Sequence, residues 1–252
     1  MLSLKSRREI ENMREAGKLL AACHREIRKR VKPGVTTMEI DRFVDEFLDE
    51  HGATPEQKGY EGFPFATCAS VNDEICHGFP TEKPLEDGDI VTIDMVVNLN
   101  GWLADSAWSY GVGNVSEEAD KLLNTTKESL YAGIEQAVVG NRMGDIGHAI
   151  QSIAEPRGLS VVRQFIGHGI GQNMHEDPQV PHFGTAGKGL RLKEGMVITI
   201  EPMLNTGAFE AKVDNNQWTA RTVDGGLSAQ YEHTVAITKD GPQILTEQDE
   251  EA

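Results

Sequence analysis

Four acidic residues lie at strand-like positions where acids are disfavoured. Asp94 and Glu201 each close a β-branched run of four residues, and Asp105 lies in the next predicted strand. Glu232 lies in another strand-like segment, residues 229–237. One buried carboxylate can be satisfied by an arginine or by backbone donors. Four in comparable settings call for a shared cation, because uncompensated buried charge is very costly. The pattern therefore predicts a metal site.

A hairpin signal brings two of these acids together. Asn100-Gly101 is the pair preferred in two-residue hairpin loops. With these two residues as the loop, Asp94 faces Ala107, and Asp105 is its diagonal neighbour on the same face. Such neighbours lie roughly 7–8 Å apart, which lets their side chains converge on one ion. The alternative is two exposed acids on a solvated hairpin face.

Three histidines lie in glycine-rich or turn-rich surroundings. His168 is flanked by glycines after a predicted strand at 161–166, and His77 and His175 lie in predicted turns. Flanking glycines let a backbone approach a ligand closely. The segment lacks the GxGxxG spacing and the following helix of a phosphate-binding loop. Each histidine alone would more often be structural than catalytic. A cysteine hydrolase using Cys76 beside His77 is disfavoured, because adjacent strand residues point to opposite faces.

Helices and an internal repeat must position these groups. A helical period runs from about Ser6 to Val31, and a second helix begins at a cap formed by Thr36 or Thr37 and ends by Gly52. Further along the chain, residues 140–146 resemble 34–40 at an offset of 106, and 193–201 resemble 87–94 at an offset of 107. Their shared order suggests two α/β halves related by a pseudo-twofold axis. The alternative is chance similarity.

Length and composition favour one folded domain over residues 1–252. We expect pseudo-repeats at roughly 1–112 and 113–247, followed by a short acidic tail at 247–252. The net charge is −16, but residues 1–32 carry ten Lys/Arg against four Glu. The strongly acidic remainder argues against stable nucleic-acid binding, because phosphate affinity depends on cationic side chains.

The apolar runs, the N-terminus and the cysteines indicate the compartment and whether the protein associates with a membrane. The longest apolar runs are far shorter than the ~20 residues that span a bilayer, so we expect no membrane association. We see no secretory signal at the charged N-terminus. Three cysteines without CxxC spacing favour a reduced compartment. We therefore expect a cytoplasmic protein.

Six motifs together resemble the type I methionine aminopeptidases of the pita-bread metallopeptidase family. The motifs cover nearly the whole chain in family order and lie at 70–78, 88–94, 167–171, 174–176, 195–202 and 230–234. The resemblance implies an α+β pita-bread fold, with two pseudo-symmetric α/β halves around a mostly antiparallel curved sheet. It also implies removal of the N-terminal methionine from nascent proteins when the second residue is small, by metal-activated hydroxide attack on the first peptide bond.

The resemblance also assigns ligands. Two divalent metal ions would be held by Asp94, Asp105, His168, Glu201 and Glu232, with Asp105 and Glu232 bridging. Four carboxylates neutralise two divalent ions, and oxygen-rich ligation favours Co, Mn or Fe, with Zn as an alternative. A monovalent-cation site is implied near Asn72, Glu74 and Ser228.

Further roles carry over to the catalytic and substrate-binding residues. Glu201 corresponds to the proton shuttle, His175 to the group that stabilises the oxyanion, and His77 to a substrate hydrogen-bonding group. The methionine pocket would use Tyr60, Phe63, Cys68 and Trp218, for which core packing is the alternative. Trp108 and Gln57 depart from the usual pattern, which leaves fine substrate preference open.

Spacing and charge restrict the type and the partners. Only 25 residues lie between His175 and Glu201, which leaves no room for the helical insertion of type II enzymes. We expect a monomer that acts on nascent N-termini, and the basic stretch Arg25–Lys32 suggests transient ribosome contact. The rival functions are a prolidase-type aminopeptidase and a metal-free binding protein on the same scaffold.

Overall fold

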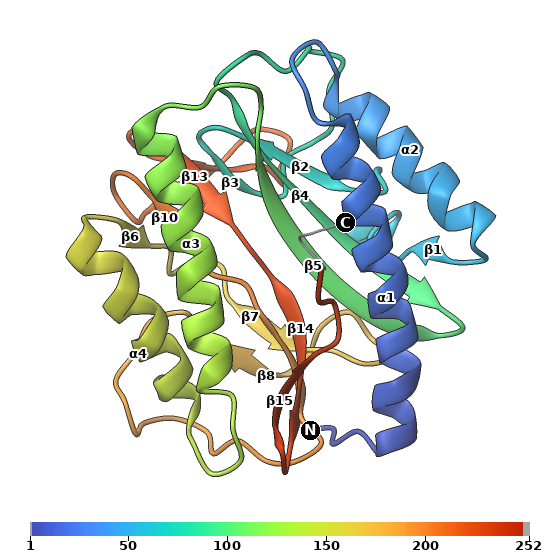
Figure 1. Cartoon of the computed structure of the whole chain (residues 1–252), viewed down its shortest axis with the longest axis vertical. Coiled ribbons are helices and arrows are strands. Elements are labelled where there is room, and N and C mark those ends of the chain that lie inside the picture. The colour runs from blue at the N-terminus through green and yellow to red at the C-terminus, as the bar shows by residue number, and fades with distance from the viewer. Residues whose placement is uncertain (1, 249–252) are drawn as a thin grey trace.

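The computed structural model describes residues 2–248, so the predicted acidic tail beyond residue 248 lies outside the described residues. The helices are α1 (Arg7–Arg30), α2 (Thr37–Glu50), α3 (Glu117–Glu135) and α4 (Met143–Ala154), with short 3-10 helices at Tyr60–Gly62 and Glu155–Arg157. Figure 1 shows α1 with α2 at the right and α3 with α4 at the left, with strands between them. Each half of the chain therefore supplies one helix pair.

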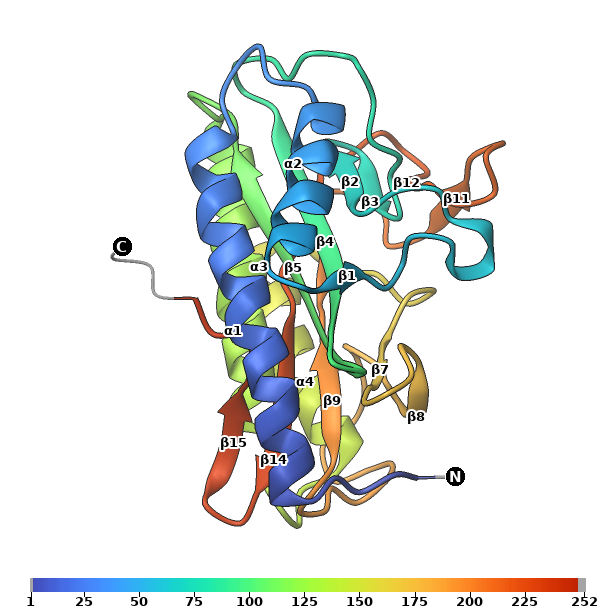
Figure 2. The ribbon, with the colours of Figure 1, turned by 90° about the vertical axis from the view of Figure 1, so that its right-hand side faces the viewer.

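The strands pair antiparallel throughout the described part of the chain and form four sheets. In the first, β4 (Ile90–Leu99) pairs with β1 (Thr54–Pro55), β2 (Cys68–Val71) and β5 (Trp102–Gly111). The second has the order β15 (Gly241–Ile244), β14 (His233–Thr238), β9 (Val197–Ile200), β7 (Gly167–Gly169), β8 (Glu176–Val180). Two smaller sheets have three strands each. One has the order β13 (Ser228–Gln230), β10 (Met203–Asn205), β6 (Ser160–Val161). The other has the order β11 (Ala211–Val213), β12 (Ala220–Thr222), β3 (Glu74–Cys76). Figure 2 shows α1 and α3 on one side of the central strands and β7, β8, β11 and β12 on the other.

The predicted helix starts and the predicted hairpin are confirmed. Ser6 caps α1 and Thr36 caps α2, each through a reciprocal capping box with the glutamate three residues later. In the β4–β5 hairpin, Asp94 is the partner of Ala107, as expected from the Asn-Gly loop. Asp105 pairs with Val96 and is therefore the diagonal neighbour of Asp94.

Side-chain hydroxyls join the two central sheets where the halves meet. The Thr234 hydroxyl accepts from the Asp105 amide at 2.9 Å and donates to the Asp105 carbonyl at 2.8 Å. The hydroxyls of Ser106 and Ser109 donate to the carbonyls of Glu232 and Gln230, at 2.9 and 2.8 Å. We call this the hydroxyl seam. It satisfies backbone groups that the regular sheet ladders leave free at the junction.

The segments that match at these offsets also share local backbone geometry, although the division into two repeats stays a prediction. Gly34 and Gly140, offset by 106, have φ angles of +91° and +98°. In both halves the next helix begins with the same contact, an amide that donates to an acidic side chain three residues later at 2.7 Å. Gly88 and Gly195 likewise have positive φ angles, +97° and +88°, and they precede the strands that lead to Asp94 and Glu201. The pseudo-repeat is thus supported at the turns that precede its helices and strands.

Two strand predictions are confirmed only in part. The expected strand at 161–166 is limited to Ser160–Val161, because its partner β10 begins at Met203 and the preceding Pro202 has no amide to extend the pairing. The expected strand at 229–237 is interrupted at Tyr231 and Glu232. There the Tyr231 hydroxyl donates to the Ser109 carbonyl at 3.0 Å, so tertiary contacts override local strand propensity.

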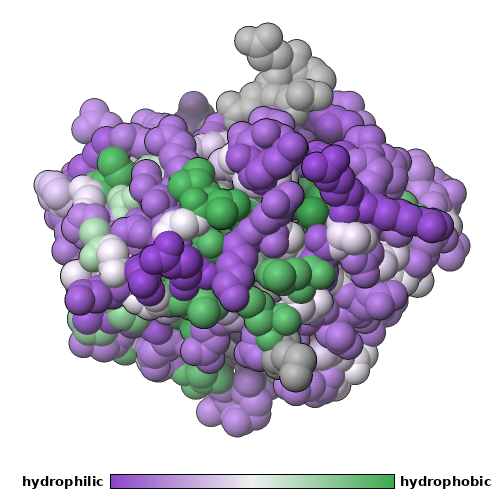
Figure 3. Space-filling view, turned by 90° about the horizontal axis from the view of Figure 1, so that it is seen from below, coloured by the Kyte–Doolittle hydropathy of each residue, from purple (hydrophilic) through white to green (hydrophobic). Residues whose placement is uncertain are grey.

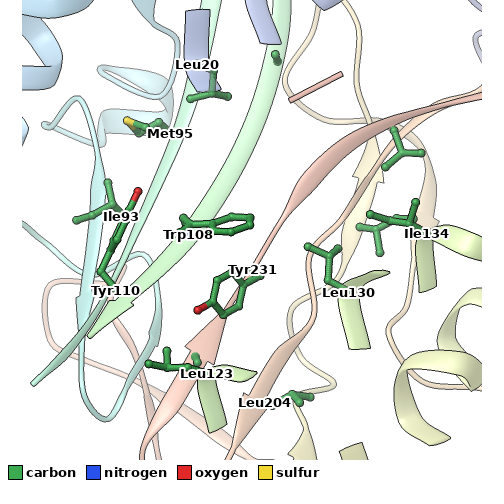
Figure 4. Close-up of a cluster of buried hydrophobic side chains, with 14 of the residues drawn as sticks. Leu20, Ile93, Met95, Trp108, Tyr110, Leu123, Leu130, Ile134, Leu204 and Tyr231 are labelled. Carbon is green, nitrogen blue, oxygen red and sulfur yellow. The ribbon is translucent and has the colours of Figure 1, made fainter. Parts of the chain in front are cut away.

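Trp108 is part of the main core and not of the substrate pocket. Its ring lies edge-on to Tyr231 with centroids 4.8 Å apart, and only 4% of the residue is exposed. Figure 4 shows this pair between Ile93 and Leu130 within the buried cluster. This departure from the family pattern therefore affects the packing behind the site.

The face of the molecule seen from below is mainly hydrophilic, with separate hydrophobic patches (Figure 3). Across residues 2–248, none of the helices combines the length and apolarity needed to cross a membrane.

Gly17 provides a test of how α1 packs. A methyl group added there would lie 2.0 Å from the Leu245 carbonyl oxygen, whereas one added at Gly133 would meet the flexible Ile150 side chain at 2.8 Å. We expect Gly17→Ala to lower the free energy of unfolding by about 1–3 kcal/mol despite the higher helix propensity of alanine. Gly133→Ala should cost less. Urea denaturation measures both, and equal stability of Gly17→Ala and the parent would contradict this packing.

Candidate metal centre

One cavity of about 1110 Å³ collects the predicted site residues. It is lined by all five predicted metal ligands, by His77 and His175, and by the four predicted pocket residues Tyr60, Phe63, Cys68 and Trp218. Gln57 lines it as well. The structure therefore brings together residues that are spread over more than 170 positions of the sequence.

The acids reach the cavity from both halves of the molecule. Asp94 and Asp105 come from the β4–β5 hairpin, and Glu201 directly follows β9. Glu232 lies in the break between β13 and β14, where its amide donates to the Ala107 carbonyl at 2.9 Å. The hydroxyl seam fixes the backbone of Asp105 and Glu232 directly.

His168 faces the acids with one ring nitrogen. Its Nδ1 contacts the Gly169 carbonyl at 2.9 Å, which makes Nδ1 the protonated nitrogen. Its Nε2 lies 3.6 Å from Asp105 Oδ2 and 3.7 Å from Glu201 Oε1. Ligand atoms of Asp105, His168 and Glu232 all lie within 4.8 Å of one another. A backbone carbonyl on Nδ1 and an open Nε2 are typical of a metal-binding histidine.

Burial and like charge disfavour ionisation of the acids without a cation. Burial raises the pKa of Glu201 to about 7; nearby His168 opposes this rise and Asp105 adds to it. Burial also raises the pKa of Asp94 and Glu232 well above their ordinary values, and the Asp105 carboxylate is the next cause for both. Such a group of carboxylates can ionise together only when positive charge lies among them.

The residues fit divalent cations. Asp105 Oδ1 and Glu232 Oε1 are buried and have no hydrogen-bond partner within residues 2–248. Buried oxygens without partners are rare in native proteins and indicate an ion or a ligand. The donor set of four carboxylates and one imidazole suits Mn, Fe, Co or Zn.

His77 and His175 lie beside this cluster. The His175 ring is 4.4 Å from the His168 ring, and its Nδ1 shares a hydrogen bond of 3.1 Å with the Tyr60 hydroxyl. Burial lowers the pKa of His175, and the charge of His168 lowers it further. Burial lowers the pKa of His77 to about 4, so its ring is neutral at neutral pH. Both rings can therefore exchange hydrogen bonds with a substrate.

The pocket residues form an aromatic wall next to the acids. The rings of Phe63 and Trp218 meet edge to face with centroids 5.1 Å apart, and Cys68 is buried beside them in the cavity lining. Gln57 uses its amide on the sheet: Nε2 donates to the Asp94 carbonyl at 3.0 Å and Oε1 accepts from the Val96 amide at 2.5 Å. Both polar ends of Gln57 are therefore occupied by backbone.

Sequence reasoning missed three residues that hold Glu201. The Thr199 hydroxyl donates to Glu201 Oε1 at 2.7 Å, and Gln230 Nε2 donates to its Oε2 at 3.3 Å. The Glu201 amide donates to Nε2 of His182, a fully buried ring. Thr199 could have been found from the alternation of β9, because it lies two positions before Glu201 on the same face.

The residues of the predicted monovalent-cation site lie together outside the cavity. The Ser228 amide donates to the Asn72 carbonyl at 2.9 Å, and the Ser228 hydroxyl is buried without a partner in the described chain. The Glu74 carboxylate already accepts from the Val71 amide and from Arg221, both at 2.7 Å. Its side chain is therefore committed to other contacts.

The pH dependence of stability tests these electrostatics. Burial alone would lower the pKa of His168, but Asp105 and the charge of Glu201 outweigh it and raise the pKa to about 9. A raised pKa adds stability below the unfolded value of about 6.5, and this stability is lost as pH rises toward 9. We expect chelator-treated protein to lose about 1–3 kcal/mol of unfolding free energy from pH 6.5 to 8.5.

The control is His168→Gln, whose loss over the same range should be smaller than that of the parent, because only the acids with raised pKa values still contribute to it. Saturating Mn²⁺ should also remove the loss in the parent protein, because metal ligands bind in their deprotonated forms. Urea denaturation at several pH values measures all three. Equal slopes for His168→Gln and the parent would contradict the assignment.

Comparison with known proteins agrees with this site. Residues 11–239 match the model of metallopeptidase family M24. A methionine aminopeptidase of Clostridium perfringens is 52% identical over 98% of this chain and 99% of its own length, and methionine aminopeptidase 1 of Bacillus subtilis is 50% identical over the same shares. The crystal structure of methionine aminopeptidase from Rickettsia prowazekii matches with a TM-score of 0.97 at 43% identity, covering 98% of this chain and 100% of that chain. The chain thus belongs to metallopeptidase family M24, and it resembles bacterial methionine aminopeptidases over nearly its whole length.

Proposed function

We propose that this chain is a type I, bacterial-type methionine aminopeptidase. It removes the N-terminal methionine from nascent proteins and peptides whose second residue is small. The observation that carries the proposal is a single cavity in which four carboxylates, buried at Asp105 and Glu232 and partly buried at Asp94 and Glu201, lie with His168 beside an aromatic pocket. Full-length similarity to proteins named methionine aminopeptidase supports the same reaction.

The metal ligands in this proposal are Asp94, Asp105, His168, Glu201 and Glu232. The unpartnered oxygens of Asp105 and Glu232 support this assignment. Two divalent ions would balance the charge of the four carboxylates, and when bound they supply a water acidic enough to act as a nucleophile near neutral pH. Oxygen-rich ligation favours Mn, Fe or Co over Zn.

Three side chains move or hold protons around the scissile bond. Glu201 takes a proton from the attacking water and returns it to the leaving amine. His175 is oriented by Tyr60 and donates a hydrogen bond to the oxygen that becomes negative. His77, whose ring lies edge-on to Phe165, hydrogen-bonds the substrate amide.

The methionine side chain would occupy the wall formed by Tyr60, Phe63, Cys68 and Trp218. A flexible thioether packs well against aromatic edges and faces. Phe63 and Cys68 are buried, and the Trp218 ring packs against Phe63. These residues form the enclosed part of the pocket, and Tyr60 lies on its more exposed side. The Gln57 amide is held by β4, so it adds no free polar group to this wall.

A monovalent cation near Asn72, Glu74 and Ser228 is a further part of the proposal. The unpartnered Ser228 hydroxyl supports it, with backbone carbonyls as the remaining ligands. Added K⁺ should then raise the melting temperature of the parent and have no effect on Ser228→Ala. An equal effect on both proteins would refute this site.

The same function implies the partners and the compartment. We propose a cytoplasmic monomer that meets nascent chains through transient contact of Arg25–Lys32 with the ribosome. In this stretch Glu26 pairs with Lys29 and Arg30, which reduces its positive charge. Unchanged ribosome cosedimentation after charge reversal at Arg25, Lys29 and Lys32 would refute the contact. Sedimentation equilibrium tests the monomer.

Hydrolysis of Met-Ala-Ser tests the function directly. Chelator-stripped protein should be inactive, and Mn²⁺ or Co²⁺ should restore release of methionine. Glu201→Gln removes both a ligand and the proton shuttle, so kcat should fall by about 10³-fold or more.

Two further peptides separate the rival functions. Met-Leu-Ser should be cleaved much more slowly than Met-Ala-Ser, and Ala-Pro should not be cleaved. Preference for Ala-Pro would favour a prolidase-type enzyme. A folded protein that binds Mn²⁺ and cleaves none of the peptides would contradict the proposal.

A further inference from the structure

A buried ion pair ties the N-terminal segment to the loop that carries His175. The Lys5 amide donates to the Gly195 carbonyl at 2.6 Å, and the Lys5 ammonium pairs with the Glu176 carboxylate. The two side chains are only 5% and 14% exposed. Figure 2 shows the N-terminal segment passing below β8. This pair is therefore far more enclosed than the ion pairs on the outer face of α1, such as Lys18 with Glu15.

Glu176 lies close to both site histidines, to one along the chain and to the other across the sheet. It directly follows His175 and starts β8, where it pairs with Gly169, the residue after His168. Its second oxygen lies 3.4 Å from the Asn173 amide. The position of Glu176 therefore sets both the end of the loop at 170–175 and the start of β8.

Gly171 shows that the loop is shaped around this pair. A methyl group there would lie 2.5 Å from Lys5 Cε and 2.7 Å from Glu176 Oε1. On the other side, the Gly171 carbonyl accepts from the Leu103 amide of β5 at 3.0 Å. The loop is thus held between β5 and the N-terminal segment, and its last residue before β8 is His175.

The energetics favour a positioning role over a general surface interaction. A carboxylate this buried keeps its place only while its cation stays, because removing one partner leaves an uncompensated charge. Losing either partner also breaks the tie between the N-terminal segment and the loop at 170–175, so the adjoining backbone is no longer held in place. A hydrogen-bond donor to a transition state is sensitive to displacements on the order of 1 Å.

We infer that Lys5 is a positioning residue for the reaction: its ion pair with Glu176 fixes the loop at 170–175 and holds His175 in place over the acidic cluster. This inference rests on the proposed function. Lys5 and Glu176 line the same cavity as the acids, but neither is among the proposed metal ligands, and Lys5 acts through the position of His175.

The test uses the full-length, Mn²⁺-loaded protein and Met-Ala-Ser. Lys5→Met should lower kcat about 10-fold or more, since losing one oxyanion donor outright costs about 10²–10³-fold. KM and Mn²⁺ affinity, measured by electron paramagnetic resonance, should stay within about threefold, and Lys5→Arg should restore most of kcat. Lys18→Met, which breaks the exposed pair, is the matched control and should behave like the parent.

Two further variants separate positioning from stability. Lys5→Met with Glu176→Gln leaves no unpaired buried charge, so it should fold like the parent and still show the low kcat. In a His175→Ala background, Lys5→Met should lower kcat by less than about twofold more, because the residue it positions is gone.

The outcomes also separate this inference from the proposed function. An inactive parent protein with bound Mn²⁺ overturns the proposed function. An active parent overturns the role of Lys5 if the double variant Lys5→Met, Glu176→Gln keeps full kcat, or if the effects of Lys5→Met and His175→Ala multiply in full.

Discussion

Mutual repulsion among buried carboxylates is the constraint on which the rest of this structure depends. Asp94, Asp105, Glu201 and Glu232 converge from distant parts of the chain into one cavity, where burial opposes the ionisation of Asp94, Glu201 and Glu232. Such a cluster is stable only when the surrounding structure holds the carboxylates in place and a bound ligand offsets their repulsion. The hydroxyl seam between β5 and the segment of β13 and β14 holds two of these backbones in place. In the proposed function, the divalent ions that relieve the repulsion also supply the chemistry.

Much of this site could be predicted from the sequence because local rules fix it. The Asn-Gly loop sets the register of β4 and β5, so the relation of Asp94 to Asp105 follows from a two-residue signal. Acids at the ends of β-branched runs are equally visible. The repeat offset placed Glu201 opposite Asp94 in the other half, and matching glycine conformations support that correspondence.

What the sequence could not predict depends on partners distant in the chain. The strand expected at 161–166 stops early because its partner β10 begins only at Met203, after Pro202. Glu232 reaches the site through a strand break that Tyr231 stabilises by bonding to β5. His182 holds the Glu201 backbone, and no local pattern marks it. The same holds for Lys5, which reads as one more charge ahead of a basic helix until the fold buries it against Glu176.

The positions of bound Mn²⁺ ions test the proposed metal centre most directly. Crystals of the full-length protein grown with Mn²⁺, measured on both sides of the manganese absorption edge, give anomalous difference maps that locate the ions. We predict two strong peaks among the carboxylates of Asp94, Asp105, Glu201 and Glu232, with His168 contacting one of them. A saturated crystal with no manganese in this cavity, or with manganese only elsewhere on the molecule, would contradict it.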